Sequence, residues 1–251
     1  MTRSLSAIGV FLGAILASGV AVTGQGVYPF HSAPPVGLNP GDSFRIAFVT
    51  NSRMTAVSGD IEDYNNFAQS EANENALLAG LNTTWRAIGS TGAITARENT
   101  ETDPANGVGE PIYLVDGQSL VASSNADLWD GLLTTPVFLD QDGRMGPQTF
   151  DMEGFDLASP GEILTWTGTN PGGDRDLDLG TAPAPFFAVT YGSGDFADSR
   201  WIERHGTDFK DRELPLYVLS QPITAVPEPD GLFGLGAAFL AGSGLWRRRS
   251  G

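Results

Sequence analysis

The hydrophobic positions between residues 43 and 222 form one helical pattern followed by several short runs typical of strands. Residues 43–50 (SFRIAFVT) are rich in β-branched and aromatic side chains, which predicts a first strand. In residues 60–81, apolar side chains recur at steps of three and four, which predicts a helix with one buried face. Asp60 is placed to cap this helix and Gly80 to end it. The expected buried positions are Ile61, Tyr64, Phe67, Ala68, Ala72, Ala76 and Leu77.

The rest of this region is typical of short strands joined by long loops. Residues 111–115 and 120–122 flank an Asp-Gly pair, which predicts a hairpin. Residues 163–167 and 214–220 predict two more strands, the second of which closes the domain. A helix followed by short strands predicts one α+β domain over residues 43–222. Smaller expected features are a core segment at 85–88, a helical turn at 125–131 capped by Ser124 and seated by Trp129 and Leu132, a β excursion at 137–139 with a turn at 140–143, and a Gly/Pro turn at 170–173.

Residues 1–24 are typical of a secretory signal peptide. Arg3 supplies the positive start, residues 8–16 form the apolar run, and small residues follow at the expected cleavage positions. The alternative is an N-terminal membrane anchor, but the apolar run is shorter than the roughly 20 residues that a spanning helix needs. Residues 25–42 are a proline-rich lead-in to the domain.

The end of the sequence is also typical of a membrane-directed signal. An apolar, glycine-rich stretch covers residues 231–246, which as a helix would span ~24 Å, marginal for a hydrocarbon layer of ~30 Å. The arginines that follow it are expected to stay in the cytoplasm, so the rest of the chain lies outside. The parts of this signal are Val226, Pro227, Glu228 and Pro229 before the stretch, and Arg247, Arg248 and Arg249 after it.

This order of parts, over residues 226–249, resembles the bacterial PEP-CTERM sorting domain. The resemblance implies recognition by an exosortase-type processing enzyme, cleavage near residues 227–229, and release or attachment at the cell surface. The alternative is a permanent single-span anchor. Recovery of residues 247–249 in secreted material would exclude processing.

The domain itself resembles the endostatin-like branch of the C-type lectin-like fold. The similar motifs are DYNNFAQ at 63–69, TWRAI at 84–88, PIYL at 111–114, ADLWDG at 126–131, WTGTNPGG at 166–173 and YVLS at 217–220. Exported bacterial proteins of unassigned function have an even closer pattern. The resemblance implies the fold but departs in its chemistry: the family's disulfide positions fall near Asn66 and Ser220, its zinc-binding histidines have no counterpart beside His31, and its arginine-rich heparin surface is missing.

The amino-acid composition limits the classes of partner and of chemical site that this protein can have. A net charge of −16 makes nucleic acid an improbable partner, because binding to a phosphate backbone depends on cationic contacts. The absence of cysteine excludes disulfides, thiolate metal sites and cysteine nucleophiles. An exported chain without cross-links must be stabilised by packing, with or without bound ions.

One acidic motif is a candidate calcium site. Asp174, Asp176 and Asp178 alternate between two glycines, and calcium favours several oxygen ligands on a flexible loop. The alternative is a solvated acidic loop. Asp140 and Asp142, followed by glycine, form a weaker motif that ordinary turn chemistry also explains. No other cofactor is expected.

The residues for catalysis are few. His205 is the only histidine expected within the domain, and the sequence has no nucleophile-elbow motif. Trp201, in a charged segment, is a candidate for stacking on a sugar, with burial as the alternative. We therefore expect an exported, non-catalytic binding or structural protein whose partner is surface polysaccharide or another envelope component. The alternative function is a carboxylate-dependent extracellular glycan hydrolase.

Overall fold

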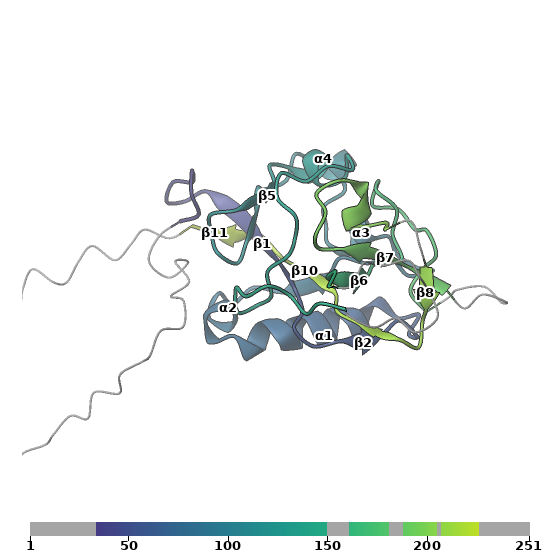
Figure 1. The fold of residues 1–251 in the computed structure, drawn as a ribbon. Helices are drawn as coiled ribbons and strands as arrows, with labels where there is room; N and C mark the ends of the chain where they lie inside the picture. Colours follow the sequence, from purple (N-terminus) through teal and green to yellow (C-terminus); the bar gives the residue numbers. More distant parts are fainter. Residues whose placement is uncertain (1–33, 150–160, 181–187, 205–206, 226–251) are drawn as a thin grey trace, which may run out of the picture.

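The computed structural model describes residues 34–149, 161–180, 188–204 and 207–225 (Figure 1). The signal peptide, the start of the lead-in and the sorting segment lie outside the described residues. The elements in chain order are β1 (Ser43–Val49), β2 (Met54–Thr55), α1 (Ile61–Glu74), α2 (Ala76–Gly80), β3 (Trp85–Ala87), α3 (Ala96–Asn99), η2 (Pro104–Asn106), β4 (Ile112–Leu114), β5 (Leu120–Ala122), α4 (Asn125–Leu128), β6 (Leu164–Trp166), β7 (Ala188–Ser193), η3 (Ser199–Trp201), β8 (Thr207–Phe209), β9 (Glu213–Leu214), β10 (Tyr217–Ser220) and β11 (Ile223–Thr224).

The fold is a mixed α+β domain built on a central sheet. Its strand order is β3-β10-β1-β4-β5, with β11 paired to the start of β1. β1 runs parallel to β4 and antiparallel to β10, so the predicted first and closing strands are neighbours. Two smaller sheets, β2-β9 and β6-β7-β8, complete the fold.

β1 is buried on both faces, which explains its nearly continuous apolar sequence. Phe44, Ile46 and Phe48 point into the core beneath α1, whereas Ala47 and Val49 point into a second core on the other side. This alternation follows from the two-residue period of a strand. The predicted first strand and the α+β class are both confirmed.

The predicted helix over residues 60–81 is two helices, because Asn75 interrupts it. Asn75 has extended backbone angles, and its side-chain oxygen accepts hydrogen bonds from the N–H groups of Leu77 and Leu78. The break changes the buried face: Ala76 is exposed, and Leu78 is buried. The Asp60 cap and the end at Gly80 are confirmed.

Side chains of α1 close one edge of the central sheet. The N–H of Trp85 donates to Gln69, and the N–H of Ala87 donates to Asn65. Asn65 also exchanges hydrogen bonds of 2.9 Å with Asn99, which bonds the Ala87 carbonyl in turn. These amides satisfy groups that an edge strand otherwise leaves for another chain.

The predicted hairpin, the Ser124-capped turn and the strand at 163–167 are confirmed as β4-β5, α4 and β6. Leu132 does not seat the turn on the sheet, because it is 60% exposed and only Trp129 is buried. The expected closing strand is split into β9 and β10, since the Pro215 carbonyl instead accepts a bond from the N–H of Trp166. The expected β excursion at 137–139 is not a strand, since only Leu139 and Asp140 form isolated bridges. The turn at 140–143 is confirmed by the hydrogen bond from the N–H of Gly143 to the Asp140 carbonyl.

The packed domain extends beyond residues 43–222 at both ends. The N–H of Val36 donates to the Gly117 carbonyl, and the Val36 carbonyl accepts from the Tyr113 hydroxyl. At the other end, β11 pairs with β1, and the backbone of Ala225 forms two hydrogen bonds with Gly41 and Asp42, just before β1. The second half of the proline-rich lead-in is therefore part of the domain.

Candidate functional site

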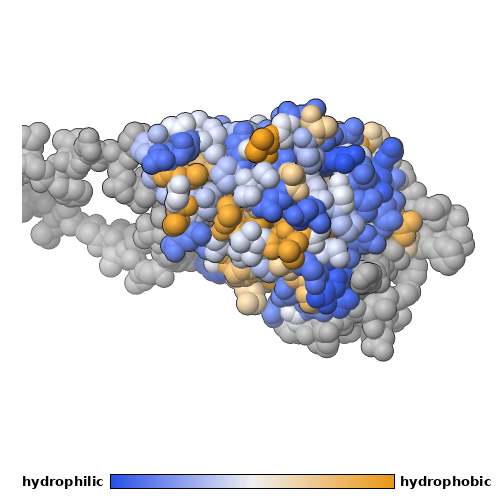
Figure 2. Space-filling model, turned by 90° about the horizontal axis from the view of Figure 1, so that it is seen from above, coloured by the Kyte–Doolittle hydropathy of each residue, from blue (hydrophilic) through white to orange (hydrophobic). Residues whose placement is uncertain are grey.

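Three loops from distant parts of the sequence are bonded together. They are residues 92–109, 123–131 and 168–180, which we call the loop cluster. The N–H of Asn125 donates to the Val108 carbonyl at 2.7 Å, and the Arg175 guanidinium donates to the Gly92 carbonyl. The face that carries α4 is mostly hydrophilic, with small separate groups of apolar residues (Figure 2). The loop cluster is thus a polar region with a defined conformation.

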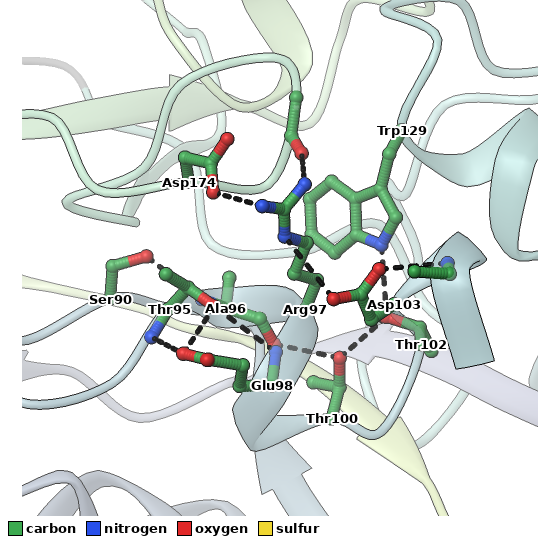
Figure 3. A network of polar contacts seen from close by, with 12 residues as sticks. Ser90, Thr95, Ala96, Arg97, Glu98, Thr100, Thr102, Asp103, Trp129 and Asp174 are labelled. Atoms are coloured by element: carbon green, nitrogen blue, oxygen red, sulfur yellow. Dashed lines mark hydrogen bonds and ion pairs between the residues drawn. The ribbon is translucent and has the colours of Figure 1, made fainter.

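Arg97, on α3, is the centre of the loop cluster (Figure 3). Its guanidinium lies 2.5 Å from an oxygen of Asp174 and 3.8 Å from an oxygen of Asp103, and it donates to the Gly172 carbonyl at 3.4 Å. The side chain of Arg97 is 32% exposed and that of Asp174 is 47% exposed. The two groups therefore connect loops yet remain accessible to a ligand in water.

A capping box fixes the short helix that carries Arg97. Thr95 accepts a hydrogen bond from the N–H of Glu98, and Glu98 accepts from the N–H and hydroxyl of Thr95. The same two bonds from Thr95 lower the pKa of Glu98. The sequence contains the signal for this helix, Thr-x-x-Glu at residues 95–98, although the helix is not among the predicted elements.

A buried chain of hydroxyl groups joins α3 to the third loop. Ser90 accepts a hydrogen bond from the N–H of Ala96 (Figure 3). Ser90 also shares a hydrogen bond of 2.8 Å with Thr169. Thr169 donates to the Thr167 carbonyl, so Ser90 is the donor in the bond with Thr169. The hydroxyl groups of Ser90 and Thr169 therefore both have hydrogen-bond partners, which favours one conformation of the loops.

Trp129 joins the second loop to the other two. Its ring is buried, and its indole N–H donates to the Thr102 hydroxyl at 2.9 Å. Gly173 packs on the ring so closely that an added Cβ would lie 2.7 Å from a ring carbon. Gly173 also has a φ of +79°, which favours glycine. The glycine-rich turn is thus needed for close approach to Trp129.

The three aspartates proposed for calcium do not act as one group. Asp174 faces Arg97, whereas Asp176 accepts a hydrogen bond from the Thr190 hydroxyl. Among the residues that the structure describes, no group of three or more His, Cys, Asp or Glu side chains has an arrangement that could hold a metal ion. Calcium binding at Asp174, Asp176 and Asp178 stays a prediction.

A second, buried acidic network lies beyond the end of β1. Glu71 accepts from the N–H of Ser52 and from the amide of Gln141. Asp140 is 2% exposed and accepts from the N–H groups of Asp142 and Arg144. Burial raises the pKa of Asp140, although these two bonds oppose the rise.

The other candidate residues are either buried or outside the described part. Trp201 is 0% exposed, with its ring 5.9 Å from Trp129 and 5.6 Å from Tyr217. It therefore has no exposed face on which a sugar could stack. His31, His205 and the sorting residues 226–229 and 247–249 lie outside the described residues.

Within the described ranges, no helix has the length and apolar character needed to cross a membrane. The sorting segment is not part of those ranges. A scan against protein-family models and a search of curated proteins both find nothing that matches this chain.

Proposed function

We propose that this protein is exported and acts at the cell surface or in the extracellular matrix through a non-catalytic, C-type-lectin-like domain. The proposal takes the leader and the sorting signal from the sequence, with processing by an exosortase-type enzyme. The neighbouring positions of β1, β10 and β11 support the lectin-like assignment, because the expected closing strand returns to the first strand.

The observation that carries the binding role is the position of Arg97. It lies between carboxylates from two loops, and both it and Asp174 are partly exposed. These carboxylates contact a cation rather than each other, which is a less suitable arrangement for acid–base catalysis than for recognition. Loops held on a rigid sheet are a common location for binding residues.

The chemistry of this surface fits a hydroxyl-rich ligand. Asp174 offers acceptor oxygens, and Arg97 offers donors in a fixed plane. A sugar presents both donors and acceptors without a net charge, so the negative charge of the protein does not repel it. We therefore propose surface polysaccharide as the ligand.

A glycan array with the full-length chain in detergent tests this proposal. Arg97→Ala and Asp174→Asn are each expected to lower the affinity for a bound glycan at least about tenfold. Arg144→Ala is the matched control, because Arg144 also forms an exposed ion pair with an aspartate, at 2.8 Å from Asp142. Equal binding by all three variants would reject the loop cluster as the site.

The hydrolase alternative has one supporting observation. Asp140 is buried and has a raised pKa, as a general acid requires. If the protein hydrolyses glycans, reducing ends will be released by the wild type and not by Asp140→Asn. Saturable binding with unchanged glycan supports the non-catalytic function instead.

A further inference from the structure

The segments at which the chain begins and ends the described domain lie side by side (Figure 1). Ser43 at the start of β1 pairs with Thr224 in β11. The N–H of Gly41 donates to the Ala225 carbonyl, and the N–H of Ala225 donates to the Asp42 carbonyl, both at 2.8 Å. Ala225 is therefore held in place on the central sheet.

The chain after Ala225 reaches its apolar stretch within a few residues. Only residues 226–230, two of which are proline, separate Ala225 from Gly231. A fully extended chain covers at most ~3.6 Å per residue, so Gly231 lies within ~22 Å of Ala225. If residues 231–246 enter a bilayer, as the proposed function holds, this end of the domain must be close to the lipid headgroups, which are ~5–8 Å deep.

The same end presents an apolar side chain to solvent. Val36 is 65% exposed, and bonds to Gly117 and Tyr113 fix its backbone. Two carboxylates belong to the segments around Val36: Asp42 accepts a hydrogen bond from the N–H of Asn39, and Asp116, next to Gly117, accepts one from the N–H of Gln118. Hydrophobic colouring is visible in Figure 2 at the end of the molecule that adjoins the grey tails.

We propose that the end of the domain formed by residues 36–42 and β11 lies against the lipid surface, because the short connection keeps this end within ~22 Å of residue 231. This inference rests on the proposed function. Val36 contacts the headgroup layer, and the opposite end faces away from the membrane. β1 separates the two ends by ~20 Å, and Val57, 51% exposed, lies beyond its far end, after β2.

The absence of cysteine makes a direct test possible, since one introduced cysteine carries one label. Val36→Cys and Val57→Cys are labelled with the same fluorophore in the full-length chain and reconstituted into phospholipid vesicles that contain a headgroup nitroxide. We expect several-fold stronger quenching of the label at position 36. Val57 is the matched control, because both valines are exposed and neither is in the loop cluster.

The outcomes separate this inference from the proposed function. A chain that does not float with the vesicles contradicts membrane anchoring itself. A chain that floats and shows equal quenching at the two positions overturns the orientation alone. A Gly/Ser insert of about 12 residues between Ala225 and Val226 adds about 20 Å of flexible reach. We expect it to reduce quenching at position 36 to the level at position 57, and persistent quenching would overturn the argument from reach.

Discussion

Helix α1 and the loop cluster obtain their order in different ways. α1 is held by a periodic row of buried side chains, including Tyr64, Ala68 and Ala72. The loop cluster is held by Arg97, by capping and hydroxyl bonds, and by glycines that allow close approach. The first kind of order comes from burial of apolar surface, and the second from polar bonds between residues far apart in the sequence. We expect mutations to affect the two regions by different amounts and for different reasons.

The largest effect is expected in the core beneath α1. Phe48 is fully buried, with its ring 5.4 Å from Trp85 in an edge-to-face contact. Phe48→Ala should lower the free energy of unfolding by about 3–5 kcal/mol, because it removes apolar contact and leaves a cavity. Urea unfolding measures this loss. Val57→Ala, at an exposed position, should cost less than about 0.5 kcal/mol, and equal losses would contradict the assigned core.

The second-largest effect is expected at Gly173 in the loop cluster. A comparison with Gly37 separates the cost of crowding against Trp129 from the cost of backbone strain. Gly173→Ala should lower the free energy of unfolding by about 2–5 kcal/mol, because the residue has positive φ and the new methyl group would overlap Trp129. Gly37→Ala has a similar φ of +89° but meets no atom within 4 Å, so it should cost only about 1–2 kcal/mol. Equal losses in the two variants would show that packing on Trp129 is not tight.

The two kinds of order also explain how much the sequence predicts. Three elements are predicted from their own residues: β1 from its β-branched and aromatic side chains, α1 from its helical period, and the β4-β5 hairpin from its Asp-Gly pair. The break at Asn75 is not predicted, because its amide also donates to the Gln141 carbonyl in a distant turn. The split at Pro215 likewise depends on a partner, Trp166, from another sheet.

The candidate site is predicted less well than the fold. Asp174 is found by its spacing from other aspartates, but its actual partner, Arg97, has no local signal. Trp201 has charged neighbours in the sequence, which favours an exposed position, yet η3 places it in the core beside Tyr217. Contacts between distant segments decide both cases, and neither periodicity nor motif spacing contains them.

A smaller effect is expected from the central ion pair of the loop cluster. In a double-mutant cycle of Arg97→Ala and Asp174→Asn, the coupling free energy should be below about 1 kcal/mol, because water screens partly exposed charges. The coupling should fall further in high salt. A coupling of several kcal/mol would mean that this pair alone maintains the loops, and the hydroxyl chain through Ser90 and Thr169 would then be secondary.

The smallest effect concerns pH and the buried acidic network. Burial raises the pKa of Asp140 in the folded chain, whereas in the unfolded chain the carboxyl has its ordinary value of about 3.9. A proton therefore binds the folded form more tightly, and this stabilisation is complete below the ordinary pKa and lost as the pH rises through the raised one. From about pH 7 to about pH 4, the wild type should gain stability relative to Asp140→Asn, as measured by urea unfolding. If the wild type instead loses stability relative to this variant, the hydrogen bonds from Asp142 and Arg144 to the carboxylate outweigh its burial.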